Sequence, residues 1–267
     1  MCRPWLIGAL FLAWCPPAAA EMVEGLYRGE AIVTGQENLE ERRRGFREAL
    51  QEAIVKVTGN SRLAEDRRLA SALADAGGYV AAFEYEDRLA KKKLMDEQGT
   101  RERSWFLRVD FDPTKVDCLV AELGARPWGV DRPRMLVLVG IRDTLGAYTL
   151  GSDGERGYGQ CEALLSIAGR RGVPVVLPRT GSDEALVAQN AEFVGADTET
   201  IARRKIAYRA DAVLLGTMTI TPEGVWDTQW TLLPGREQHR WRIDGTTFDR
   251  AIADGIEGSA RILAGAE

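Results

Sequence analysis

The stretch from Met135 to Ile141 reads MLVLVGI, an unbroken apolar run. Such a run is typical of a β-strand covered on both faces of its sheet, because a strand with one wet face alternates apolar and polar residues. A second apolar strand is predicted from Val173 to Leu177, after a helix from Gln160 to Arg171. This alternation of strand and helix predicts a sheet with helices packed against it.

Downstream of these elements the pattern changes to consecutive strands. After a helix around Thr198 to Tyr208, strands are predicted at Ala212 to Thr221, Trp226 to Leu232 and Arg240 to Asp244. A closing helix is expected from Phe248 onward, because Thr246 or Thr247 can cap it. Residues 135–267 are therefore expected to form a C-terminal α/β domain of order β-α-β-α-β-β-β-α with a mixed sheet.

Upstream of Met135 the sequence predicts a separate α+β domain over residues 21–126. The predicted elements, of order β-α-α-β-β-α, are a strand at Leu26 to Thr34, helices at Leu39 to Thr58 and Ala64 to Ala76, strands at Tyr79 to Glu86 and Trp105 to Phe111, and a helix that begins with Asp112 and Pro113. Residues 127–134 carry two prolines and a glycine, and we assign them to a linker. The fold class is thus α/β (α+β), with two small domains.

The first twenty residues have the three parts of a signal peptide. Arg3 supplies the positive charge, residues 6–14 an apolar run, and Ala18 to Ala20 the small residues that signal peptidase requires. The apolar run is too short to span a bilayer, which takes roughly 20 residues. We expect cleavage after Ala20, release into the periplasm, and no membrane insertion of the mature chain.

Composition excludes several classes of function. The 267 residues carry a formal net charge of −5, and each basic cluster lies beside acids, so a nucleic-acid partner is not expected. His239 is the single histidine, so a two-histidine metal site is excluded. Neither a nucleophile elbow nor a dinucleotide fingerprint is present, and we assign no catalytic, cofactor or metal-binding residue.

Glycines 151, 154, 157 and 159 lie between a predicted strand and a predicted helix, where phosphate-binding loops occur. The loop is too long for that role and carries Asp153 and Glu155, so we interpret it as a mobile surface loop. Cys118 and Cys161 remain after cleavage. They either form a disulfide in the oxidising periplasm or stay as two buried thiols.

Four tryptophans are the candidate recognition residues. Trp226 and Trp230 share one face of a predicted strand, and Trp241 lies on the next strand. An exposed stripe of this kind could stack on sugar rings or anchor a partner protein, whereas core packing beneath the closing helix is the simpler interpretation. Trp128, in the predicted linker, is expected to fill the space between the domains.

Several segments resemble a known family of exported bacterial proteins. They are VKVTGN (55–60), YVAAFEYE (79–86), ARPWGVDRPRMLVLV (125–139), RRGVPVVLP (170–178) and YRADAVLLG (208–216). The chain is similar in these segments to the domain of unknown function 2066 family, and the second half resembles the N-terminal domain of TolB in fold alone. The resemblance implies no established activity and no site residue.

Two hypotheses of function follow. The first is a non-enzymatic interaction or accessory protein of the cell envelope, with an envelope protein as partner. The alternative is a binding module, or a hydrolase without familiar motifs, for a small envelope molecule such as a glycan fragment. Its site would lie in a cleft between the domains, near Trp128 and the glycine-rich loop.

Overall fold

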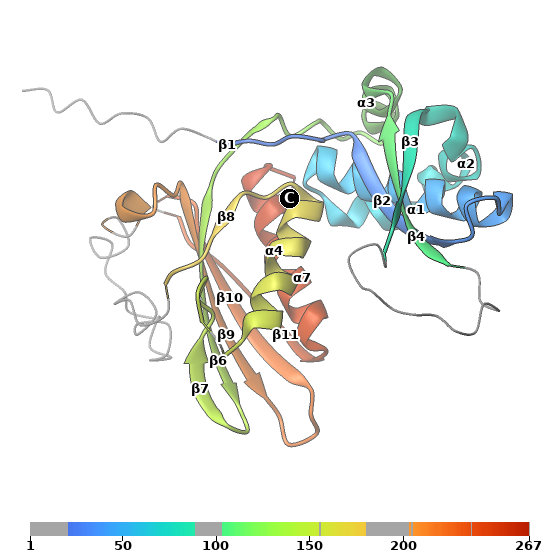
Figure 1. Ribbon diagram of the computed structural model, residues 1–267. Helices are drawn as coiled ribbons and strands as arrows, with labels where there is room; N and C mark the ends of the chain where they lie inside the picture. The colour runs from blue at the N-terminus through green and yellow to red at the C-terminus, as the bar shows by residue number, and fades with distance from the viewer. Residues whose placement is uncertain are drawn as a thin grey trace, which may run out of the picture.

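The computed structural model describes residues 21–88, 103–154, 156–179, 203, 205–235 and 237–266. It has an α+β fold with one antiparallel sheet in the N-terminal half and one mixed sheet in the C-terminal half (Figure 1). The predicted signal peptide, and most of the helix predicted around Thr198 to Tyr208, lie outside the described residues. No helix among the described residues is long and apolar enough to cross a membrane.

The N-terminal sheet has the strand order β2-β4-β3, and all of its pairs are antiparallel. The strands are β2 (Arg28–Thr34), β3 (Val80–Asp87) and β4 (Ser104–Phe111). Helix α1 (Leu39–Thr58) packs on one face, where it meets the buried side chains of Val33, Leu107 and Val109. The predicted bounds of α1 are confirmed, because Asn38 caps its first turn and Gly59, at φ 69°, ends it.

The short helix predicted from Ala64 to Ala76 is wrong in one respect, because the segment is broken. It consists of η1 (Ser61–Glu65), η2 (Arg67–Leu69), α2 (Ala70–Ala74) and η3 (Ala76–Tyr79). The carboxylate of Asp66 accepts a hydrogen bond from the backbone N–H of Arg68 and so starts a new turn inside the segment. Helix α3 (Pro113–Glu122) follows β4, and Asp112 caps it as expected.

The mixed sheet has the order β11-β10-β9-β6-β7, and β8 also pairs with β6. Its strands are β6 (Met135–Asp143), β7 (Gly146–Thr149), β8 (Val175–Val176), β9 (Ala212–Ile220), β10 (Trp226–Leu233) and β11 (His239–Thr246). Strand β6 runs parallel to β8 and β9, and the other pairs are antiparallel. The buried run in β6 thus lies inside the sheet, as its sequence predicts.

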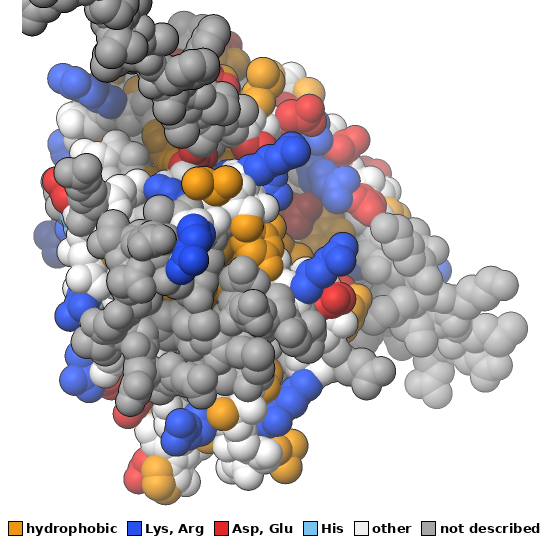
Figure 2. All heavy atoms as spheres, turned by 90° about the vertical axis from the view of Figure 1, so that its left-hand side faces the viewer, with side chains coloured by type: hydrophobic (Ala, Val, Ile, Leu, Met, Phe, Trp, Pro, Cys, Tyr) orange, Lys and Arg blue, Asp and Glu red, His pale blue; other side chains and the backbone are white. Residues whose placement is uncertain are grey.

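Helices α4 (Tyr158–Arg171) and α7 (Phe248–Leu263) cover one face of this sheet (Figure 1). Thr247 caps α7 through a hydrogen bond to the N–H of Arg250. On the opposite face a second cluster of buried residues includes Leu138, Leu215 and Leu233. Figure 2 views the molecule from that side and shows hydrophobic side chains between Lys and Arg side chains.

The predicted linker contains a short strand. β1 (Glu21–Met22) pairs with β5 (Asp131–Arg132), so the first described residues of the chain are tied to the segment between the two sheets. The backbone N–H of Trp128 also bonds to the carbonyl of Val57 at the end of α1, at 2.7 Å. The segment from 127 to 134 therefore packs between the two halves.

Candidate functional site

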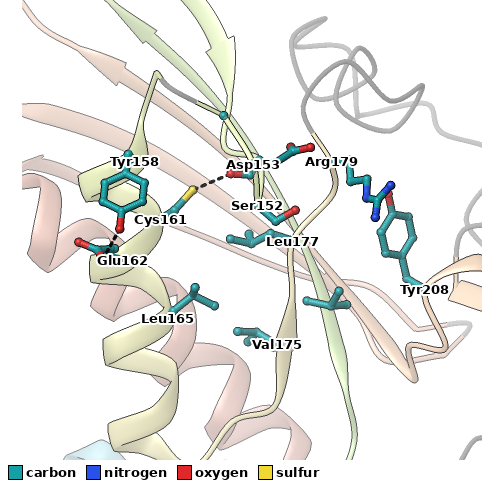
Figure 3. Close-up of a pocket in the computed structure, with 13 residues that line it drawn as sticks. Ser152, Asp153, Tyr158, Cys161, Glu162, Leu165, Val175, Leu177, Arg179 and Tyr208 are labelled. Carbon is teal, nitrogen blue, oxygen red and sulfur yellow. Dashed lines mark hydrogen bonds between the residues drawn. The ribbon is translucent and has the colours of Figure 1, made fainter.

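An open groove lies at the edge of the mixed sheet, between α4 and the short strand β8 (Figure 3). Its volume is about 980 Å³. The walls come from the loop after β7, the first two turns of α4, and the segment from β8 to Arg179. Tyr208 closes the far side.

The segment between Ile141 and the predicted helix contains a strand that was not predicted, β7, which lies just before the four glycines. β7 pairs with the end of β6, and Leu150 behind it is fully buried. Arg156 fastens the loop, since its guanidinium lies over the ring of Tyr148 and forms a 2.6 Å ion pair with Asp143. Gly157 starts α4 at φ 86°, where a Cβ would lie 2.9 Å from both Leu150 and Tyr148. The loop is thus a fitted wall of the groove.

The groove offers apolar side chains to solvent. Tyr158 and Leu165 of α4 are 63% and 47% exposed, and they lie on the same side of the helix because they are two turns apart. Val175 and Leu177 line the other wall. Large exposed apolar side chains that gather around one hollow are a feature of binding surfaces.

The polar groups of the groove suit binding better than catalysis. The thiol of Cys161 is buried and donates a 3.1 Å hydrogen bond to the carbonyl of Gly151, and burial raises the pKa of this thiol. A thiol held protonated in this way is a weak nucleophile. The hydroxyl of Tyr158 donates to Glu162 at 2.8 Å, and this bond raises the pKa of the tyrosine.

Cys161 forms no disulfide with any cysteine of the described residues. Cys118 is also free, and it is exposed on α3, so both alternatives for the cysteine pair need correction. Helix α3 buries Val116, Leu119 and Val120, and Cys118 falls between these positions on the solvent side. The two thiols belong to different halves of the chain, and only Cys161 lies at the groove.

The structure does not bring the four predicted tryptophans together at the groove. Trp230 is 1% exposed and lies beneath α7, where a Cβ on Gly255 would be 2.6 Å from its ring. Trp226 and Trp241 are half-buried against the same core, Trp226 in an edge-to-face contact with Phe248 and Trp241 donating to Asp254 at 2.8 Å. These three rings occupy the positions that the core interpretation assigns them.

Trp128 lies at the other end of α4, in a buried seam between the two halves. The guanidinium of Arg132 stacks 4.2 Å from the Trp128 ring centre. Arg132 is 0% exposed, and Trp128 is half-buried. A helix of this length spans about 21 Å. The expectation of one site near both Trp128 and the glycine-rich loop is therefore wrong, because the helix separates them.

Arg132 holds the seam together, and no carboxylate of the described residues pairs with it. Its guanidinium donates five hydrogen bonds, all to backbone carbonyls, at Lys56, Trp128, Gly129, Arg171 and Gly172. Several of these carbonyls end α1 and α4, where helix dipoles present partial negative charge. Burial lowers the pKa of Arg132 to about 10. In the same seam Arg170 of α4 forms a 2.6 Å ion pair with the buried Glu52 of α1.

His239 and the acids of the described residues form no cluster of metal ligands. His239 begins β11, and its Nε2 lies 3.7 Å from the Glu237 carboxylate. Across the described ranges no group of three or more His, Cys, Asp and Glu side chains is arranged to hold a metal ion. The groove is accordingly the candidate site that the geometry singles out.

Fold and groove together define an α+β protein with an open, partly apolar site. A family model described as Domain of unknown function (DUF8605) matches residues 20–129. The N-terminal half is thus similar to a domain without assigned activity. The resemblances to the domain of unknown function 2066 family and to TolB are not confirmed by this match. No curated protein matches the chain.

Proposed function

We propose that the protein is an exported, non-enzymatic accessory protein of the cell envelope, and that it works by binding at the groove beside β8. The observation that carries this proposal is the exposure of Tyr158 and Leu165 around a hollow of about 980 Å³. Exposing such side chains costs free energy in water, roughly 25 cal/mol per Å² of apolar surface, and a bound ligand removes that cost.

The chemistry of the groove supports a ligand with an apolar body and a polar end. Leu165, Val175 and Leu177 supply apolar surface, while Glu162 and Arg179 lie at opposite sides (Figure 3). Small-molecule sites commonly measure about 300 to 1,000 Å³, so a hollow of this size can hold a ligand of several rings. The rings of Tyr158 and Tyr208 offer stacking surfaces for a glycan fragment or a similar envelope molecule.

Export is supported by the leader sequence, in which Arg3, the apolar run of residues 6–14 and Ala18 to Ala20 follow the order of a signal peptide. Sequencing the N-terminus of the protein recovered from the periplasm is expected to give Glu21. Recovery of the uncut chain in the cytoplasm would contradict export and the proposed role in the cell envelope.

The groove is tested by a pair of matched variants. Leu165→Arg places a charge in the groove, and Leu145→Arg makes the same change at an 84% exposed leucine in the β6–β7 turn, outside it. Both variants and the unaltered chain are screened by thermal shift against envelope small molecules and glycan fragments.

A compound that raises the melting temperature of the unaltered chain and of Leu145→Arg, but not of Leu165→Arg, is the expected result. Equal stabilisation of all three proteins would place the ligand elsewhere. A screen at saturating concentration without any stabilisation would count against a small ligand in the groove.

A further inference from the structure

The two outer edges of the N-terminal sheet differ in how their backbone is satisfied. Along β2 the outward groups are covered by side chains of α1. Lys56 donates to the carbonyl of Arg28 at 2.6 Å, Arg44 donates to the carbonyl of Ile32 at 2.7 Å, and Glu41 accepts from the N–H of Thr34 at 3.1 Å. Side chains that occupy an edge in this way prevent another strand from pairing with it.

The edge at β3 has no such cover among the described residues. The carbonyl of Ile32 points out of β2, and Ile32 pairs with Phe106, so the backbone groups of Phe106 and Arg108 point toward β3. Their partners Glu86 and Glu84 point back to β4, and the backbone groups of Phe83 and Tyr85 therefore point away from the sheet. No hydrogen bond from a side chain of the described residues reaches these outward groups. The middle of the strand, from Ala81 to Glu84, is exposed. A strand of this length with a free edge is a template for strand addition.

Cationic and aromatic side chains flank the free edge on the α1 face. The guanidinium of Arg42 lies 5.3 Å from the ring centre of Phe83 and 5.8 Å from that of Tyr85. It donates to the hydroxyl of Tyr85 and to the carbonyl of Gln36, at 2.8 and 2.7 Å. Arg42 is therefore fixed beside the edge, with no carboxylate of the described residues against it.

A hollow of about 270 Å³ lies beside these side chains, between the first half of α1 and η3. Leu39 and Phe46 give it apolar walls, and Phe46 contacts Phe83 with ring centres 5.3 Å apart. Arg43 lies at its rim, exposed and without an ion pair among the described residues. Asp75 is the acid that also lines it.

We propose that the edge of β3 is a docking site for an extended, acidic segment of a partner protein, which pairs with it as a fourth strand. Alternate side chains of a strand point to the same face, so one face of the incoming segment meets Arg42, Arg43 and the hollow. That face should carry acidic and apolar side chains in turn. The other face meets Glu84 and Glu86 and should be uncharged. The edge of β3 is a different surface from the groove, so the peptide experiment can fail without contradicting the proposed function.

Synthetic peptides test the proposal on the full chain. The probe is a blocked ten-residue peptide in which threonines alternate with glutamate and valine, and a matched peptide carries lysine in place of glutamate. Binding is followed by fluorescence anisotropy at low salt, and the contact by amide chemical shifts of Phe83 and Tyr85. We expect the acidic peptide to bind, the lysine peptide not to bind, and salt to weaken the complex.

Backbone pairing is tested by N-methylating the peptide at either its odd or its even positions. One edge of a strand uses alternate amides, so one methylated set is expected to abolish binding and the other to retain it. Equal tolerance of both sets would overturn strand addition. Absence of binding by the acidic peptide would overturn the site.

Charge is tested by Arg43→Glu, with Arg62→Glu as the matched control. Arg62 is exposed and follows the far end of α1, which lies about 22 Å of helix length from Arg43. Arg43→Glu is expected to weaken peptide binding by roughly three- to tenfold, and Arg62→Glu to leave it unchanged. Sedimentation without peptide completes the test, since a dimer joined through β3 would make a second copy the occupant and contradict the proposal.

Discussion

The two ends of α4 meet opposite surroundings. At its C-terminal end the carbonyls of Arg171 and Gly172 accept hydrogen bonds from the buried Arg132, and Arg170 reaches Glu52 of the other half. At its N-terminal end Tyr158 and Leu165 are exposed beside the groove. One helix thus joins a closed seam to an open hollow.

The difference shows that one end of α4 stabilises the fold while the other end remains accessible to a ligand. The seam satisfies its polar groups internally, so altering it leaves buried donors or acceptors without partners. The groove leaves apolar surface in water, which favours ligand binding over stability. Substitutions at the two ends of α4 should therefore separate effects on folding from effects on binding.

The largest effect is expected at the seam centre. Arg132→Met keeps the aliphatic stem but removes the donors to five carbonyls, and we expect the free energy of unfolding to fall by at least about 3 kcal/mol. Chemical denaturation measures this change. Arg126→Met, at an exposed arginine just before this segment, is the control and should change stability little. An equal loss of unfolding free energy in both variants would show that the hydrogen bonds of Arg132 do not stabilise the seam.

A smaller effect is expected from Glu52→Gln. The carboxylate of Glu52 is buried, but Arg170 is more than half exposed, so solvent screens the pair. We expect a loss of about 1 kcal/mol. A double-mutant cycle with Arg170→Gln measures the interaction between the two side chains. A coupling energy of zero would show that the ion pair does not stabilise the seam.

At the open end, Leu165→Arg is expected to change the free energy of unfolding by less than about 0.5 kcal/mol while it abolishes ligand stabilisation. Denaturation and thermal shift on the same preparation check both parts. A large loss of stability would mean that Leu165 belongs to the core and not to the groove, which would break the contrast with the seam.

The smallest perturbation is chemical labelling of the two thiols. Cys118 is exposed and should react rapidly with a thiol reagent, whereas Cys161 should react slowly because its pKa is raised above the ordinary value of 9.0. Thiolate forms as pH rises through the pKa, so labelling of Cys161 should increase at higher pH than for a free thiol. Mass spectrometry assigns the labelled residue, and equal rates for the two cysteines would contradict the buried position of Cys161.

Local signals predicted the elements that have clear ends. Asn38 and Gly59 bound α1 at the predicted residues, and the apolar run in β6 predicted a strand inside a sheet. The breaks between Ser61 and Tyr79 were missed because a single capping aspartate, Asp66, restarts the chain inside an otherwise helical composition. The strand at β7 was missed because it is only four residues long and forms through its pairing with the end of β6.

The groove and the seam could not be predicted, because both depend on contacts between residues far apart in the sequence. Arg132 looks in the sequence like any surface arginine, and its partners are backbone carbonyls, which leave no side-chain pattern. The groove needs the shortness of β8 and the position of Tyr208 against it. The candidate tryptophans were the visible signal, but large aromatic rings fill cores at least as often as they form sites.

The seam is assembled from segments that lie far apart in the sequence. β1 pairs with β5 across more than a hundred residues. Gly59 packs against Ala260 of α7 and against Ala264, the residue that follows the helix. Contacts of such sequence separation form late, because the connecting chain must lose its freedom first. The N-terminal half has a buried cluster of its own, so we expect it to fold before the seam closes. Docking of the two halves is then expected to be the last step of folding.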